Sequence, residues 1–139
     1  MKIIEDIKEF TVNRKKWLRG EGSDKSYLMD PISGKMCCLG FYAKQSGLSK
    51  KDIESMPSPG SVIQLLNGDE VYTNAEVICR PAKPIKWNTK LIWRGQKCNS
   101  KTCDALMDAN DDEDITDEVR EKNLTSLFKK IGITVKFIG

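Results

Sequence analysis

The sequence contains no histidine among its 139 residues. This absence excludes Ser-His and Cys-His catalytic pairs and every histidine metal ligand. The chain also lacks a GxxxxGKS/T phosphate loop, a GxGxxG dinucleotide motif and a GxSxG nucleophile elbow. Because no motif calls for an enzyme, we expect a non-enzymatic protein without a cofactor or a metal. Its cysteines, carboxylates, basic residues and tryptophans are left to carry the function.

Long apolar runs are also missing. No stretch approaches the roughly 18–20 apolar residues that span a bilayer. The first residues, Met1-Lys2-Ile3-Ile4-Glu5-Asp6, carry acids where a signal peptide needs an apolar core. We therefore expect a cytoplasmic protein. The length, with 39% hydrophobic and 31% charged residues, is typical of one globular domain.

The charge is distributed unevenly along the chain. Residues 1–103 carry 18 Lys and Arg against 11 Asp and Glu, a net charge of +7, and residues 104–139 carry 5 against 9, a net charge of −4. The basic part favours an anionic partner, whereas the acidic part would repel one.

The first half of the chain predicts several short elements. In order they are a helix over 1–10 with a strand as the alternative, a short helix over 14–19, a strand over 26–29, a turn over 30–34 and a buried helix over 36–45. Asn13 is the expected N-cap of the second element, which Gly20 ends. Ser49 and Asp52 resemble a capping box that opens one further helical turn.

The second half of the chain is harder to interpret, except near the C-terminus. Residues 57–60 are a firm break, and strands are expected over 76–80 and 90–94. Thr116 caps a predicted helix whose apolar face comprises Val119, Leu124, Leu127, Phe128 and Ile131. The alternating residues 133–138 then predict a strand. We expect an α+β fold: one compact domain over 1–139, with short helices on a small, mostly antiparallel sheet that includes the C-terminal strand, and an insertion-like region at about 57–104.

Cys37 and Cys38 are adjacent, which suggests two interpretations. At a helix start the dipole would lower a thiol pKa and make a reactive cysteine. Alternatively, both pack as small apolar residues beside their apolar neighbours, the interpretation that we favour. We do not expect a zinc site. Cys98 and Cys103 have nearly the spacing of a zinc knuckle, but Cys37 and Cys38 are adjacent and cannot supply the second pair of ligands.

Acidic residues crowd positions 104–118, and the run over 108–114 partly matches a calcium loop. With Asp108 as the first ligand, Asn110 and Asp112 fit the third and fifth positions. Glu113 replaces the required glycine, and Val119 replaces the bidentate glutamate, so the match fails. We interpret the run as a solvated acidic loop and helix start, with a carboxylate- or thiol-dependent enzyme as a further alternative.

Two basic segments that contain tryptophan are the best candidates for a binding site. Cations bind phosphates, and tryptophan can stack on a base, so this composition predicts a nucleotide or nucleic-acid site. The alternative is that the tryptophans are core anchors and the cations a solvated face. The candidate ligand-binding residues are Arg14, Lys16, Trp17, Arg19, Lys86, Trp87, Trp93 and Arg94.

Three stretches form a signature: Trp17-Leu18-Arg19-Gly20, Ser26-Tyr27-Leu28 and Gly34-Lys35-Met36-Cys37-Cys38-Leu39-Gly40-Phe41. Together with the C-terminal ending they resemble a set of small uncharacterised proteins encoded by bacteriophages and prophages. The resemblance covers most of the chain except about residues 57–104. It implies a phage accessory protein in a bacterial cytoplasm, and it brings no established activity.

The expected function is therefore that of a phage or prophage accessory protein that binds a host factor or an anionic nucleotide, as a counter-defence inhibitor or sequestering protein. The alternative is a nucleic-acid-binding protein that uses the basic tryptophan segments. The expected partners are a host protein, a nucleotide or a nucleic acid, and no membrane. The oligomeric state stays open, with a homo-oligomer as one alternative.

Overall fold

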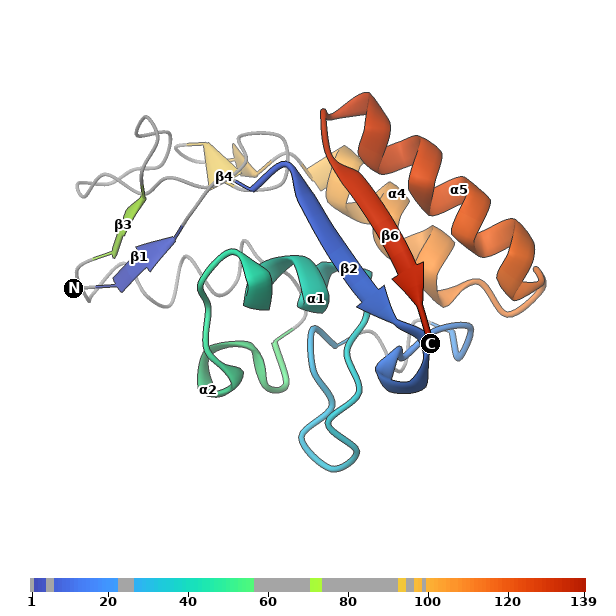
Figure 1. Ribbon diagram of the computed structural model, residues 1–139, viewed down its shortest axis with the longest axis horizontal. Helices are drawn as coiled ribbons and strands as arrows, with labels where there is room; N and C mark the ends of the chain where they lie inside the picture. The colour runs from blue at the N-terminus through green and yellow to red at the C-terminus, as the bar shows by residue number, and fades with distance from the viewer. Residues whose placement is uncertain are drawn as a thin grey trace.

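The computed structural model describes residues 7–22, 27–56 and 104–139 with their side chains (Figure 1). For residues 2–4, 71–73, 93–94, 97–98 and 100–103 it describes the backbone of a helix or strand. The strands expected over 76–80 and 90–94, and most of the insertion-like region, lie outside these residues apart from the short pieces just named.

A parallel pair of strands forms one layer of the fold. β2 (Glu9–Asn13) pairs with β6 (Thr134–Ile138), and Phe10 lies opposite Val135 in the register. The C-terminal strand thus belongs to a small sheet, as expected, but the expected antiparallel pairing is wrong. Parallel strands need a long crossover connection, and here the chain between residues 13 and 134 supplies it. Alternation within one strand carries no information about the direction of its partner.

Two shorter strand pairs are also described. β1 (Lys2–Ile4) pairs in parallel with β3 (Val71–Thr73). β4 (Trp93–Arg94) pairs antiparallel with β5 (Lys97–Cys98).

Helices cover one face of the pair formed by β2 and β6. Those described are η1 (Arg14–Lys16), a 3₁₀ turn, and the α-helices α1 (Cys38–Gln45), α2 (Lys50–Ile53), α4 (Ser100–Asp111) and α5 (Asp117–Lys130). α1 packs against β2, α5 packs against β6, and α4 contacts both helices. Figure 1 shows α4 and α5 side by side beyond β6. The mixed α+β class is confirmed.

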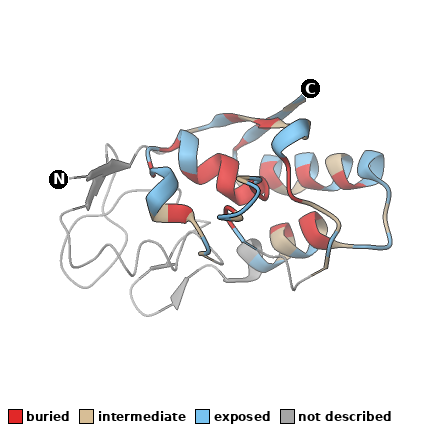
Figure 2. Cartoon of the chain, turned by 90° about the horizontal axis from the view of Figure 1, so that it is seen from below, coloured by how far each residue is buried: buried red, intermediate tan, exposed pale blue. Residues whose placement is uncertain are grey.

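Phe10 joins the two layers. Its ring makes edge contacts with Tyr42 of α1, at 5.5 Å between centroids, and with Phe128 of α5, at 5.0 Å. Each such aromatic pair contributes about 0.5–1.5 kcal/mol beyond the area that it buries. In Figure 2 the buried residues gather on α1 and on the inner sides of the longer helices. The core is therefore formed between one sheet face and these helices.

The N-terminal helix expected over 1–10 is wrong, and the strand alternative holds for part of it, because β1 and the start of β2 occupy this segment. Phe10 and Val12 are both buried and face the helices, which is a period of two. Isoleucine-rich segments suit strands, and the pairing with β6 decides the outcome.

The short helix expected over 14–19 is reduced to η1. The Asn13 side chain accepts a hydrogen bond from the Lys15 amide over 3.0 Å, which confirms its capping role. Trp17 is already extended, with φ −91° and ψ 118°, and it forms a bridge with Met36. The strand expected over 26–29 likewise reduces to single bridges at Met29.

The buried helix expected over 36–45 is confirmed from Cys38 onward, with Cys37 as its N-cap residue. Gly40 lies where α1 crosses the chain at Leu28, and a Cβ atom added there would overlap the Leu28 carbonyl oxygen. No side chain fits at this crossing, which explains a glycine inside a helix despite its low propensity. The capping box of Ser49 and Asp52 at α2 is confirmed as well.

The C-terminal helix is confirmed as α5, where the Val119 amide donates to Thr116 Oγ1 over 3.2 Å. Leu124 and Phe128 are buried, but the inclusion of Val119 in the apolar face is wrong, since it is 43% exposed. The interpretation of the acidic run as a loop is also wrong for its first part. Residues up to Asp111 belong to α4, in which Leu106, Asn110 and Asp111 are buried among the residues described with side chains.

Candidate functional site

Trp17, one of the candidate ligand-binding residues, lies in the core. Its side chain is 2% exposed, and its indole Nε1 donates to the Asn110 side-chain oxygen over 2.8 Å. Its ring packs against Phe137, at 5.1 Å between centroids, and the Arg19 guanidinium lies 4.6 Å from its centroid. An indole enclosed in this way has no free face for a base. The structure therefore supports the alternative interpretation of Trp17, a core anchor.

Arg14 and Arg19 are engaged within the protein. Arg14 donates to both carboxylate oxygens of Glu121, over 2.8 and 2.7 Å, in the bidentate geometry that favours arginine. Arg19 donates to Asp117 over 2.8 Å, and this hydrogen bond is the main reason why the pKa of Asp117 lies below its ordinary value. Both predicted ligand cations thus tie the segment after β2 to α5.

The second basic segment is described only in part. Lys86 and Trp87 lie outside the described residues. Trp93 and Arg94 form β4, of which the backbone alone is described. The structure therefore does not gather Arg14, Lys16, Trp17 and Arg19 into one site, and the proposed role of the other four candidates stays a prediction.

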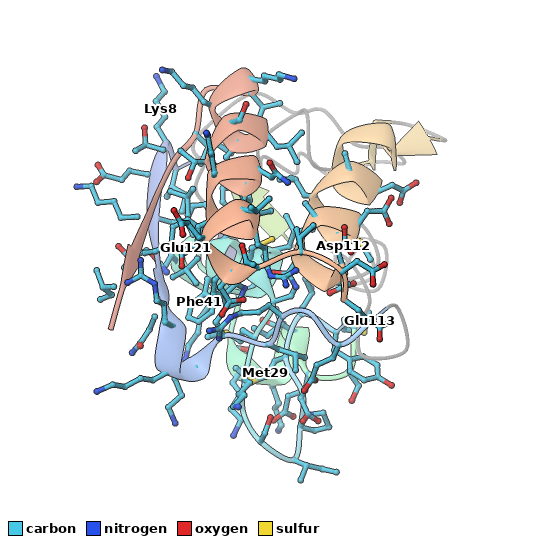
Figure 3. All side chains as sticks on the ribbon, turned by 90° about the vertical axis from the view of Figure 1, so that its right-hand side faces the viewer. Lys8, Met29, Phe41, Asp112, Glu113 and Glu121 are labelled. Atoms are coloured by element: carbon cyan, nitrogen blue, oxygen red, sulfur yellow. The ribbon has the colours of Figure 1, made fainter. Side chains whose placement is uncertain are left out.

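Lys16 lines a pocket that was not predicted from the sequence. We call it the lysine-rimmed pocket; its volume is about 310 Å³, and it is lined by Asn13, Lys16, Met29, Gly34, Met36, Phe41, Lys44 and Lys50. Its apolar floor comes from Met29, Met36 and Phe41, all of them largely buried. Figure 3 labels two of them: Phe41 lies near the middle of the molecule, and Met29 lies below it. The three lysines come from η1, α1 and α2.

Local hydrogen bonds hold the backbone in place at or next to each of the three lysines. Lys16 is held because its carbonyl accepts from the Met36 amide over 2.9 Å. Lys44 precedes Gln45, whose side-chain amide pairs with both backbone groups of Thr11 on the outer edge of β2, at 3.0 and 2.7 Å. The pocket rim is thus built on hydrogen-bonded backbone, although the lysine side chains themselves are exposed.

Lys50 is positioned by the capping box of α2. The Ser49 amide donates to the Asp52 carboxylate over 2.8 Å, and the Asp52 amide donates back to the Ser49 hydroxyl over 3.3 Å. The Lys50 ammonium lies 3.7 Å from a Glu54 carboxylate oxygen. This ion pair is largely exposed, so it contributes at most about 1 kcal/mol.

The lining of the lysine-rimmed pocket includes three lysines and no acidic residue. Within the part of the chain that the structure describes with side chains, Lys16 and Lys44 form no ion pair. Three ammonium groups around an apolar floor favour a ligand that carries negative charge at its edge and an apolar part at its centre. The volume lies at the lower end of the roughly 300–1,000 Å³ typical of small-ligand sites.

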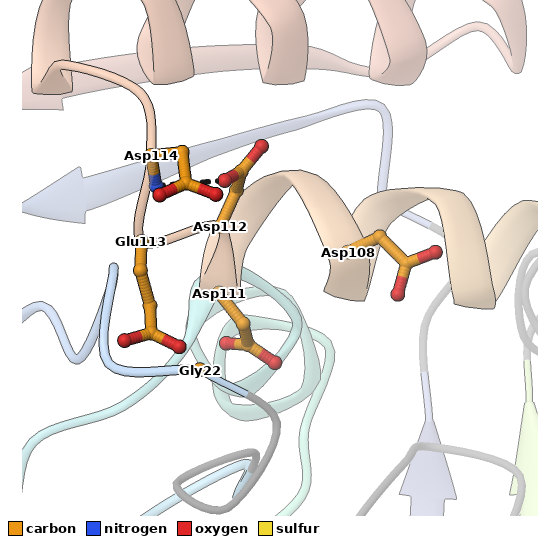
Figure 4. A pocket seen from close by; sticks show the side chains of 6 residues that line it. All are labelled: Gly22, Asp108, Asp111, Asp112, Glu113 and Asp114. Carbon is orange, nitrogen blue, oxygen red and sulfur yellow. Dashed lines mark hydrogen bonds between the residues drawn. The ribbon is translucent and has the colours of Figure 1, made fainter.

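A second, acidic hollow lies at the end of α4 (Figure 4). Its volume is about 330 Å³, and it is lined by Gly22, Asp108, Asp111, Asp112, Glu113 and Asp114. Two of its carboxylates serve the chain itself: Asp112 accepts from the Asp114 amide over 2.9 Å, and Asp111 accepts from the Asn110 side chain over 2.9 Å. Among the residues described, no group of three or more cysteine or acidic side chains is placed to hold a metal ion.

Cys37 and Cys38 are buried free thiols. Burial raises the pKa of Cys37 to about 12 and raises that of Cys38 well above its ordinary value. A thiol needs its ionised form to act as a nucleophile. The structure therefore supports the interpretation of both residues as apolar packing groups and does not support a reactive cysteine.

Sequence reasoning missed two buried polar residues that join distant segments of the chain. Asn110 accepts from the Cys38 amide over 3.1 Å and donates to the Leu18 carbonyl over 3.0 Å. Arg120, only 3% exposed, donates to the carbonyls of Asp112 and Ile115 over 2.7 and 3.1 Å. In the sequence, both residues lie among acidic residues on amphipathic helices. This pattern does not tell a buried polar residue from an exposed one.

Comparison with known protein families, with curated proteins and with solved structures found no match. In the described part of the chain, no helix has the length and apolar character needed to cross a membrane. The function must therefore be argued from the geometry of the chain itself.

Proposed function

We propose that this chain is a non-enzymatic accessory protein that binds an anionic partner in the lysine-rimmed pocket. One observation carries the proposal: Lys16, Lys44 and Lys50 reach the same apolar-floored pocket from three separate segments. Lysines that are far apart in the sequence but meet at one pocket create a local positive potential that attracts anions.

The cellular setting of the proposal rests on the sequence resemblance. A phage or prophage protein in a bacterial cytoplasm would use such a pocket to hold a host factor or an anionic nucleotide, and would thereby inhibit or sequester it as a counter-defence. The pocket supports this binding role because it combines cationic side chains with apolar surface, which both kinds of ligand require.

The nucleic-acid-binding alternative has less support. It relies on Arg14 and Arg19 for phosphate contacts, yet both donate to acids of α5. It also relies on Trp17 for base stacking, and that indole is buried. A short DNA duplex and a single strand, titrated at two salt concentrations, would test it. Affinity that falls steeply with salt would favour it over the pocket.

The proposal is tested by thermal unfolding in the presence of ATP, a cyclic dinucleotide or a hexaglutamate peptide. At least one of them should raise the unfolding temperature of the wild-type chain, because a ligand that binds only the folded state stabilises it. The increase should vanish in a triple variant with Lys16→Gln, Lys44→Gln and Lys50→Gln.

The matched control removes the same charge from α5, with Lys122→Gln, Lys129→Gln and Lys130→Gln, all at exposed positions. This control should keep the stabilisation. No stabilisation by any of the three anions, or an equal loss in both triple variants, would contradict an anion site in the lysine-rimmed pocket.

A further inference from the structure

Ile32 is an exposed apolar residue at a fixed position. Its side chain is 94% exposed, more than that of any other large hydrophobic residue among those described with side chains. Single exposed apolar residues are common, so exposure alone is not informative. What distinguishes Ile32 is that the turn that carries it is closed by hydrogen bonds on both sides.

Asp30 organises this turn. One oxygen of its carboxylate accepts from the Ile32 amide over 3.3 Å, and the other accepts from the Ser33 hydroxyl over 2.7 Å. Its backbone amide donates to the Lys35 carbonyl over 2.8 Å, and its carbonyl accepts from the Gly34 amide over 2.9 Å. A side chain on a pre-ordered turn loses little conformational entropy when a partner covers it.

The turn that carries Ile32 adjoins the lysine-rimmed pocket. Gly34, two residues after Ile32, lines the pocket with a φ of +73°, a left-handed conformation that favours glycine. Met29 and Met36 stand at the two ends of the turn, pair with each other in an isolated bridge, and form part of the pocket floor. In Figure 1 the segment between residues 27 and 36 projects from the body of the molecule.

We infer that Ile32 and the lysine-rimmed pocket together dock an acidic amphipathic helix of a partner protein. The inference rests on the proposed function and specifies its partner. A free nucleotide offers charge to the lysines but leaves Ile32 in water. An acidic amphipathic helix offers carboxylates to Lys16, Lys44 and Lys50 and an apolar stripe to Ile32 and the pocket floor.

The test uses two synthetic peptides with the same composition, about 14 residues of leucine and glutamate, or four helical turns. In one peptide the leucines recur at helical spacing, and in the other they are scattered around the helix. Fluorescence anisotropy measures the binding of each to the full chain. The amphipathic peptide should bind about tenfold more tightly than the scattered one, because only its leucines reach Ile32 together.

The variant Ile32→Asn should reduce this difference without weakening the scattered peptide, because only the pocket floor then contacts the leucine stripe. Val119→Asn, on an exposed position of α5, should leave the difference intact. Both variants change exposed residues, and unchanged unfolding temperatures would show that they fold. The docking inference would be overturned by equal binding of the two peptides, by no binding of either, or by an unaltered difference in Ile32→Asn. The thermal unfolding experiment with ATP would still test the proposed function separately. Undiminished binding by the Lys16, Lys44 and Lys50 triple variant would overturn both.

Discussion

The indole nitrogen of Trp17 donates a hydrogen bond over 2.8 Å to the side chain of Asn110, which lies 93 residues later in the chain. The same Asn110 oxygen accepts from the amide of Cys38, and its nitrogen donates to the carbonyl of Leu18. One buried amide therefore joins the segment after η1, the start of α1 and the end of α4. Because η1 and α1 carry Lys16 and Lys44, Asn110 also fixes part of the pocket rim.

Replacing Asn110 with alanine should destabilise the chain by about 3 kcal/mol. The substitution leaves buried polar groups of Trp17, Cys38 and Leu18 without this partner, and each unsatisfied group costs about 1–3 kcal/mol. Urea unfolding measures the change. The matched control is Asn123→Ala, on an exposed position of α5, which should change the stability little. Equal effects of the two substitutions would show that the buried network contributes nothing.

The Gly40→Ala variant should be severely destabilised, by about 3 kcal/mol or more. The added methyl group meets the backbone carbonyl of Leu28, which cannot move aside as a flexible side chain would. Circular dichroism during thermal unfolding measures the effect. Lys44→Ala, one turn later on the exposed side of α1, should leave the melting temperature nearly unchanged. A Gly40→Ala variant as stable as the wild type would mean that α1 does not cross the chain at Leu28 in this way.

The elements that the sequence predicted well are those with local chemical causes. Asn13, Ser49 and Thr116 act as caps through their own side chains and nearby amides, so their roles follow from a few adjacent residues. The parallel pairing of β2 with β6 depends on residues more than a hundred positions apart. Since the same alternating pattern suits either strand direction, the sequence could not supply it.

The sequence did not predict the lysine-rimmed pocket. Lys16, one of the candidate ligand-binding residues, lines it, but Arg14 and Arg19 pair with α5. Lys44 and Lys50 stand on different helices and share no motif with Lys16. Their convergence is a property of the tertiary fold, which no local pattern of charge reveals.

The buried thiols predict a loss of stability at high pH. The pKa of Cys37 is raised from an ordinary value of 9.0 to about 12, so the folded state keeps the neutral thiol while the unfolded chain ionises above pH 9. This contribution is present below pH 9 and is lost as the pH rises toward 12. Between pH 8 and 10.5 the free energy of unfolding lost in this way is about 2 kcal/mol. Urea unfolding at the two pH values should therefore show a smaller decline for Cys37→Ala than for the wild type, and identical declines would contradict the burial argument.

The ion pair of Arg19 with Asp117 predicts the opposite dependence at low pH. The pKa of Asp117 lies below its ordinary value of 3.8, chiefly because Arg19 donates to it. Its stabilisation is therefore present above about pH 4 and is lost as the pH falls through the folded-state pKa. Asp117→Asn should cost less than about 1 kcal/mol at pH 7, since the pair is partly exposed, and the cost should shrink at pH 3.

The control for that experiment is Glu118→Gln, which neutralises a neighbouring carboxylate in the same first turn of α5. No ion pair involves Glu118 among the described side chains. Its effect should be limited to the helix dipole and should be smaller at pH 7. An Asp117→Asn cost that persists unchanged at pH 3 would show that the ion pair with Arg19 is not its origin.

Backbone amide NMR during titration with ATP and, in parallel, with hexaglutamate tests the central claim most directly. At least one of these anions should give saturable shift changes clustered at Lys16, Gly34, Phe41, Lys44 and Lys50, the residues of the lysine-rimmed pocket. The amides of the acidic hollow at the end of α4 should not shift. If both anions leave the pocket amides unchanged, or if saturable shifts gather elsewhere, the lysine-rimmed pocket is not the binding site of this protein.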